Sequence, residues 1–171
     1  MKYLYLILLT SAVSCGDGKS TARGAVDSTS YTTNVIAPNA WIYSVDSDPI
    51  TDAKRKTATI IAKDPLDFPI PYDGGASVRL VVMQRSGKDE VLLQLSKGQF
   101  FGSVITARFD STPATAYRYT QPADGSLQSI FVTNERDFIK RLGKANTLLI
   151  RAPFYKAGEK DIIFNVSGFK W

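Results

Sequence analysis

Short apolar runs alternate with polar turn residues along most of the chain from residue 41 onward. Branched and aromatic residues dominate the runs, and Asp, Gly, Ser or Pro separates them. This pattern predicts eight or nine strands spaced roughly ten residues apart, in an antiparallel β-sandwich or a partly closed barrel. The expected strands are 41–45, 57–62, 77–83, 90–95, 102–109, 115–119, 128–132, 147–152 and 161–166.

Two segments interrupt this pattern. The stretch 64–75 is rich in proline, which cannot donate a ladder hydrogen bond, so we expect a loop or a sheet edge there. A helix is predicted over about residues 134–143, with Asn134 as its N-cap and Gly143 at the C′ position. Its apolar stripe is formed by Phe138, Ile139 and Leu142.

The first residues have the layout of a secretory signal. Lys2 supplies the charge, residues 4–9 are apolar, and small residues lead into Cys15. The segment Ala12-Val13-Ser14-Cys15 resembles the lipobox of bacterial lipoproteins, although Ala12 stands where leucine is commoner. The resemblance implies cleavage of residues 1–14, attachment of lipid to Cys15 and further acylation of the new amine. The alternative is an ordinary signal with an incidental cysteine.

The resemblance also implies a place in the cell envelope. Because Gly16, rather than aspartate, follows the cysteine, the enteric sorting rule favours the outer membrane over the inner one. Residues 15–40 are rich in Ser, Thr, Ala and Gly and lack an apolar period, so we expect a flexible linker. Residues 41–171 then form a single domain.

The amino-acid composition excludes several kinds of catalytic and metal-binding sites. The 171 residues include 21 basic and 16 acidic side chains, one cysteine and no histidine. Histidine-based catalysis and imidazole metal ligands are therefore excluded, and a single cysteine forms no intramolecular disulfide. The basic residues are scattered, so no nucleic-acid-binding arm is expected. We expect no enzyme, no cofactor and no metal.

Acidic residues cluster in 45–52, where Asp46, Asp48 and Asp52 recur as in a calcium loop. The glycine and terminal glutamate of an EF-hand are absent at their spacing, and Asp and Ser before proline are common turn formers. We favour a turn over a calcium site. Asp48 and Asp52 remain the best candidates for a carboxylate-based hydrolase of envelope polymers.

Tyr117 and Tyr119 are separated by one residue and therefore share a sheet face. If that face is exposed, the pair is a candidate binding surface. The alternative, which is favoured for the aromatic residues in general, is that both belong to the core.

Several short motifs resemble a family of uncharacterised lipoproteins encoded by proteobacteria and phages. They are Trp41…Ser44 with Asp48-Pro49-Ile50-Thr51-Asp52, Phe68-Pro69-Ile70-Pro71-Tyr72, Gly98-Gln99-Phe100, Arg108-Phe109-Asp110, Phe138-Ile139…Leu142, and Phe164-Asn165-Val166-Ser167-Gly168…Trp171. More loosely, the opening motif is similar to accessory lipoproteins of type VI secretion. The resemblance implies a β-rich envelope domain and supplies no catalytic residues.

These features predict a non-catalytic protein, anchored to the membrane by lipid, that binds another envelope protein. A specific version is a phage-encoded protein that blocks a phage receptor and excludes superinfection. The alternatives are a periplasmic carrier of a small ligand, a type VI secretion accessory lipoprotein, and the carboxylate hydrolase.

Overall fold

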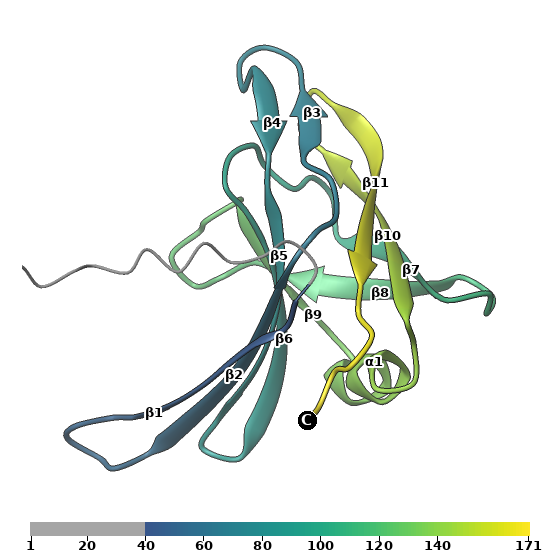
Figure 1. The fold of residues 1–171 in the computed structure, drawn as a ribbon. Helices are drawn as coiled ribbons and strands as arrows, with labels where there is room; N and C mark the ends of the chain where they lie inside the picture. Colours follow the sequence, from purple (N-terminus) through teal and green to yellow (C-terminus); the bar gives the residue numbers. More distant parts are fainter. Residues whose placement is uncertain (1–39) are drawn as a thin grey trace, which may run out of the picture. The chain divides into compact units, whose positions relative to one another are not determined.

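Nine strands pair into one antiparallel sheet, in the order β1-β2-β5-β6-β9-β8-β7-β10-β11. The computed structural model describes residues 40–171 (Figure 1). Two short strands, β3 and β4, form a separate hairpin. The elements are β1 (Ile42–Ser47), β2 (Lys54–Ile61), β3 (Leu66–Phe68), β4 (Gly74–Ala76), β5 (Val78–Arg85), β6 (Lys88–Leu95), β7 (Val104–Phe109), β8 (Thr115–Thr120), β9 (Ser129–Val132), α1 (Glu135–Leu142), β10 (Thr147–Phe154) and β11 (Gly158–Asn165).

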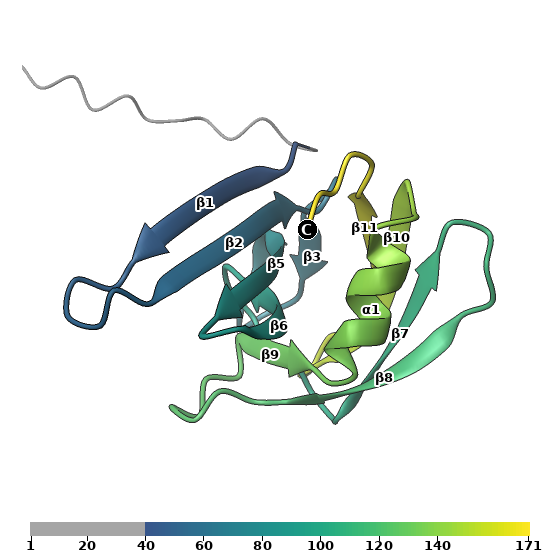
Figure 2. The same ribbon diagram turned by 90° about the horizontal axis from the view of Figure 1, so that it is seen from below.

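The sheet curls so that its two halves face each other across the core (Figure 2). β8 belongs to both halves, because its Arg118 is paired with β7 and its Tyr119 with β9. Beyond the end of β2, Lys63 N donates a hydrogen bond of 2.7 Å to Ile163 O in β11. Within residues 40–171 the sheet does not close into a barrel. The predicted class, a mainly β, antiparallel and sandwich-like fold with one helix, is confirmed.

Alternation along each strand fills the space between the halves. In β5, Val78, Leu80 and Val82 are fully buried, whereas the intervening Arg79 is exposed. β11 repeats the pattern with Ile162 and Phe164. The core is therefore built from the inward-facing residues of both halves, as the period of two predicts.

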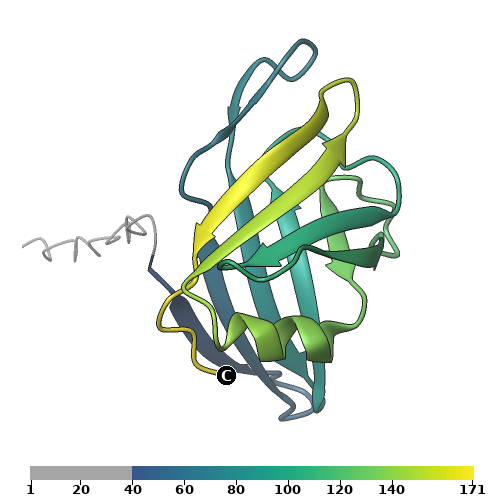
Figure 3. The same cartoon turned by 90° about the vertical axis from the view of Figure 1, so that its right-hand side faces the viewer.

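Helix α1 lies across one end of the curled sheet (Figures 2 and 3). Phe138 and Leu142 are fully buried, as the predicted stripe requires. Asn134 occupies the predicted N-cap position and Gly143 is the C-cap, one position before the predicted C′, but neither has the expected geometry. Asn134 has a left-handed backbone, φ 60°, and its side chain makes no capping hydrogen bond. Gly143 keeps a right-handed helical backbone, φ −66°, so the helix ends without the expected left-handed glycine.

The proline-rich stretch contains the β3–β4 hairpin rather than loop alone. Phe68 of β3 is 2 % exposed, and its ring centroid lies 5.1 Å from that of Phe154 in β10. The hairpin is therefore fixed to the domain by an aromatic contact that local sequence does not reveal.

The last residues fold back onto β1 and form what we call the C-terminal clasp, residues 166–171 against Trp41 and Tyr43. Trp41 Nε1 donates to Val166 O at 3.1 Å, and the backbone N of Lys170 donates to the Tyr43 hydroxyl at 2.8 Å. Phe169 lies between the two tryptophans, with ring centroids 4.7 Å from Trp41 and 6.2 Å from Trp171. The clasp thus joins the two ends of the described chain.

Trp171 also reaches two other strands. Its ring lies 4.3 Å from Lys56 Nζ of β2, and its Nε1 donates to Asp89 Oδ1 of β6 at 3.2 Å. Lys56 and Asp89 face the same side of the sheet as the buried Ala58 and Val91. Trp171 therefore covers the polar end of the core face.

The predicted signal segment 1–14, the lipid attachment at Cys15 and all but the last residue of the predicted linker 15–40 lie outside the described residues. Among residues 40–171, no helix is long and apolar enough to cross a membrane.

Candidate protein-binding surface

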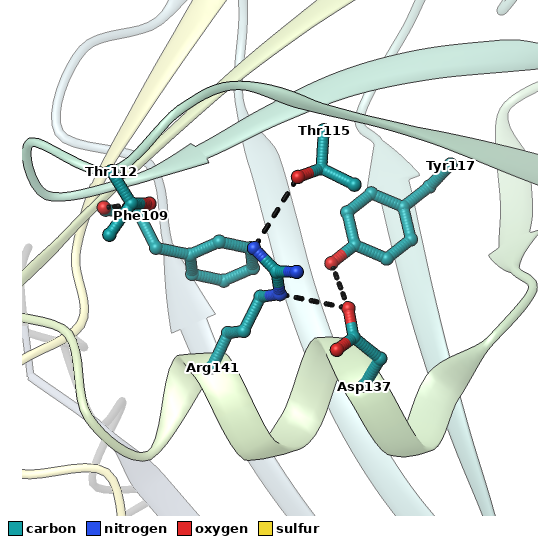
Figure 4. Close-up of polar contacts among 6 residues, drawn as sticks. All are labelled: Phe109, Thr112, Thr115, Tyr117, Asp137 and Arg141. Carbon is teal, nitrogen blue, oxygen red and sulfur yellow. Dashed lines mark hydrogen bonds and ion pairs between the residues drawn. The ribbon is translucent and has the colours of Figure 1, made fainter.

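A polar cluster joins α1 to β8 (Figure 4). The Tyr117 hydroxyl donates to Asp137 Oδ2 at 2.7 Å, and Arg141 Nε donates to the same oxygen at 2.9 Å. Arg141 Nη1 also reaches Thr115 Oγ1 at 3.4 Å. Because Asp137 and Arg141 lie one helical turn apart, the same face of α1 carries both ends of the ion pair.

The electrostatics of this cluster indicate a structural role. Burial raises the pKa of the Tyr117 hydroxyl, and the hydrogen bond to Asp137 raises it further. The hydroxyl therefore stays protonated and donates its hydrogen bond to Asp137. The Tyr117 hydrogen bond lowers the pKa of the Asp137 carboxyl, and Arg141 adds to the effect. A carboxyl group with a lowered pKa is ionised at neutral pH and therefore has no proton to donate. We infer that this polar cluster holds α1 against β8.

Tyr117 and Tyr119 do share a face, but it is the core face. Tyr117 is 2 % exposed and Tyr119 is 7 % exposed, so the exposed surface that the binding hypothesis required is absent and the core alternative holds. The hydroxyl of Tyr119 has no hydrogen-bond partner within the described part of the chain. Burial raises the pKa of this hydroxyl.

The acidic segment 45–52 comprises the end of β1 and most of the exposed turn that leads to β2. Asp48 Oδ1 accepts hydrogen bonds from the backbone N of Thr51 at 2.8 Å and of Ile50 at 2.9 Å, and these bonds lower the pKa of its carboxyl. Asp46 instead forms an exposed ion pair with Arg55, in which Oδ2 of Asp46 lies 3.8 Å from Nη2 of Arg55. Residues 40–171 contain no cluster of three metal-ligating side chains. The preference for turn chemistry at Asp48 therefore agrees with its geometry.

An apolar groove of about 360 Å³ lies where β10 and β11 meet the segment before β7. Its most exposed aromatic side chains are Phe101, 59 % exposed, and Tyr155, 40 % exposed, with ring centroids 6.3 Å apart. We call this the aromatic groove, and it is lined by Phe101, Pro153, Phe154, Tyr155, Lys156, Gly158 and Glu159.

Main-chain hydrogen bonds hold the backbone at both exposed rings. The backbone N of Phe101 donates to Pro153 O at 3.0 Å, and the backbone N of Tyr155 donates to Gln99 O at 3.0 Å. Phe100, directly before Phe101, points inward and is 2 % exposed. Alternation along this paired segment thus buries one phenylalanine and exposes the next.

A glycine permits this arrangement. Gly98 has φ +92°, and a Cβ at this position would lie 2.7 Å from Cε2 of Phe68. Only glycine combines that backbone with so close an approach. The ring of Phe68 in turn packs on Phe154, which lies 5.2 Å from Phe100, so a buried aromatic layer supports the groove.

The rim of the aromatic groove carries mixed charge. Lys156 Nζ lies 5.4 Å from the Tyr155 ring centroid, and Glu159 lines the opposite end of the β10–β11 turn. The β3–β4 hairpin lies at the same end of the sheet (Figure 1), and the loop between its strands carries Ile70, which is 83 % exposed. Exposed apolar side chains from three separate segments therefore gather at this end.

The sequence interpretation missed this surface because it assigned Phe101 and Tyr155 to the core with the other aromatics. A usable signal was present. The pair Phe100-Phe101 follows Gly98 and precedes Gly102, and consecutive residues of an extended segment point to opposite faces. One of the two rings must therefore be exposed.

Comparison of the chain with protein-family models, with curated proteins and with solved structures yields no match.

Proposed function

We propose that this chain is a non-catalytic envelope protein, anchored by lipid at Cys15, that binds another envelope protein through the aromatic groove. The exposed pair Phe101 and Tyr155 carries the proposal. Exposed aromatic side chains in an apolar surface are typical of the centres of protein interfaces, where a few such residues supply most of the binding energy.

The groove is prepared for binding. Because main-chain bonds fix the backbone at Phe101 and Tyr155, little backbone entropy is lost when a partner covers the two rings. Lys156 and Glu159 at the rim favour a partner segment that places an apolar side chain in the groove and charges of opposite sign beside each of them. A lipid tether would raise the effective concentration of the domain near membrane partners without adding any contact.

The small-ligand carrier fits the described core less well. A carrier needs an internal cavity, whereas the space between the two halves of the sheet is occupied by fully buried side chains such as Phe138 and Phe164. The groove is open to solvent and suits a protein segment instead. A phage receptor or a secretion component is a partner of this kind, and the superinfection-exclusion version remains part of the proposal.

The test compares variants of the anchored protein in its native host. A photo-crosslinking residue replaces Lys156 at the rim, and the captured protein is identified and purified. Phe101→Ala and Tyr155→Ala should each weaken its binding about tenfold or more. Ile163→Ala, which truncates an apolar side chain that is 41 % exposed and is not part of the groove lining, is the matched control and should bind normally.

Equal affinity of all three variants for the captured protein would overturn the proposal, as would the absence of any crosslinked partner for a folded, lipidated chain. The anchor is tested separately. Cys15→Ser should leave the membrane fraction and lose the mass of the lipid. For the phage version, cells that make the protein should resist infection by phages that use the partner as receptor.

A further inference from the structure

A small pocket lies on the outer face of β7 and β10, away from the core. Thr106 and Arg108 of β7 point to this face, and Leu149 and Arg151 of β10 point to the same side. In the strand register, Arg108 is opposite Leu149 and Thr106 is opposite Arg151, so the two arginines lie on a diagonal. With Ala114 they enclose about 140 Å³.

Arg151 is held in a fixed orientation. Its Nε donates to Asp161 Oδ1 at 2.7 Å, and its Nη2 donates to Oδ2 at 2.9 Å. This two-point contact engages one edge of the guanidinium and leaves Nη1 outside the ion pair. Arg151 therefore offers a positioned donor rather than a freely rotating one.

Two guanidinium groups line the pocket, and two carboxylates lie near them. Asp161 is paired with Arg151 and also interacts electrostatically with Arg108, and Glu159 interacts electrostatically with Arg151. Among residues 40–171, Arg108 forms no ion pair. Like charges on neighbouring strands repel each other, and an anion between them removes that repulsion.

The neutral lining completes the chemistry of an oxyanion site. The Thr106 hydroxyl can donate a third hydrogen bond, and Leu149 and Ala114 provide apolar walls. Planar guanidinium groups match the oxygen geometry of phosphate. The volume suits one phosphate group and is too small for a nucleotide.

We propose that the pocket between Arg108 and Arg151 binds a phosphate group, carried either by a small soluble phosphate or by the headgroup of an anionic lipid. Arg108 and the free edge of Arg151 bind its oxygens, and Thr106 donates to a further one. This site shares no residue with the aromatic groove, so either proposal can fail without the other.

The first experiment titrates inorganic phosphate into the isotope-labelled full chain carrying Cys15→Ser, at constant ionic strength. Amide NMR signals of 106–108 and 149–151 should shift and saturate. Arg108→Gln should weaken binding about tenfold or more. Arg79→Gln, which removes an exposed arginine from the outer face of β5, is the matched control and should bind like the parent chain. Both arginines are exposed, and the amide spectrum of each variant reports whether the fold is kept.

The second experiment identifies the source of the phosphate. The same chains are mixed with vesicles of phosphatidylcholine alone or with phosphatidylglycerol added. Binding to the anionic vesicles that Arg108→Gln abolishes and Arg79→Gln preserves assigns the site to a lipid headgroup. Saturable phosphate binding without vesicle binding assigns it to a soluble phosphate. Absence of saturable shifts, or equal loss in both variants, would overturn the proposal.

Discussion

Tyr117 and Tyr119 lie on one face of β8 in different polar surroundings. The hydroxyl of Tyr117 donates to Asp137, whereas that of Tyr119 is buried without a partner among the described residues. A satisfied hydrogen bond to a charged group stabilises a fold, and an unsatisfied buried hydroxyl costs free energy. The same substitution should therefore have opposite effects at the two positions.

We expect Tyr117→Phe to lower the free energy of unfolding by about 1 kcal/mol, a value reduced because Asp137 is partly exposed to solvent. Tyr119→Phe should leave it unchanged or raise it by up to about 1 kcal/mol. Urea unfolding of the three chains under one condition measures both changes. Equal losses in the two variants would contradict the assigned hydrogen bonds.

The lowered pKa of Asp137 makes the polar cluster that holds α1 against β8 sensitive to acid. Because the folded state holds this carboxyl below its unfolded value of about 3.9, its contribution is complete above that pH. The contribution is lost as the pH falls through the lower, folded-state pKa. Asp137→Asn should therefore destabilise the domain at pH 7 and reduce the loss of stability below about pH 4. Denaturant unfolding from pH 7 to pH 2 tests this, and an unchanged acid slope would contradict it.

At the residue scale, the sequence placed these tyrosines on one face and favoured the core for both, but it predicted neither the Asp137 partner of Tyr117 nor the missing partner of Tyr119. Alternation places positions 117 and 119 on one face whatever the fold. Which face is buried depends on α1, whose Phe138 packs on the Tyr117 ring at 5.2 Å. That contact joins separate elements, and no local pattern encodes it.

At the scale of elements, Gly98 couples the β3–β4 hairpin to the aromatic groove. Gly98→Ala introduces both an unfavourable φ and a Cβ close to Phe68. Gly87→Ala in the β5–β6 turn is the matched control, because it has φ +76° but no atom within 4 Å of its Cβ. We expect a loss of about 1 kcal/mol for Gly87→Ala and about 2–4 kcal/mol for Gly98→Ala.

Thermal or urea unfolding measures the difference between the two glycine variants, and partner binding provides a second readout. Gly98→Ala should weaken partner binding as well, since Phe68 supports the groove through Phe154. Equal destabilisation by both substitutions would show that backbone strain alone matters at Gly98.

Prediction of elements succeeded where a local period exists. Strands β5 and β6 were predicted from the runs 77–83 and 90–95, and the apolar stripe located α1. Prediction failed for the geometry of the helix ends. Asn134 has a left-handed backbone, and its side chain makes no capping hydrogen bond. The pairs β2–β5, β6–β9 and β7–β10 bring together strands that are distant in sequence, and alternation alone does not specify such neighbours.

For the whole molecule, the C-terminal clasp contacts β1 through Lys170 and reaches β2 and β6 through Trp171. Trp171→Ala removes the contact with Lys56 and the hydrogen bond to Asp89. We expect a loss of about 1–3 kcal/mol and faster amide hydrogen exchange in β1. Phe101→Ala is the control, because that exposed side chain should change stability little. Unchanged exchange in β1 after Trp171→Ala would contradict the role of the clasp.

The hydrogen bond from Trp41 to the carbonyl of Val166 spans 125 residues, nearly the whole described chain. Synthesis delivers a polypeptide amino-terminus first, so β1 is available long before its partners in the clasp. Until residues 166–171 follow, Trp41 and Tyr43 lack the groups that pack against them. The fold of the domain is therefore complete only after residues 166–171 have packed on β1. A chain that lacks some of these residues would leave Trp41 and Tyr43 uncovered and should be degraded faster by the proteases that remove incompletely folded proteins.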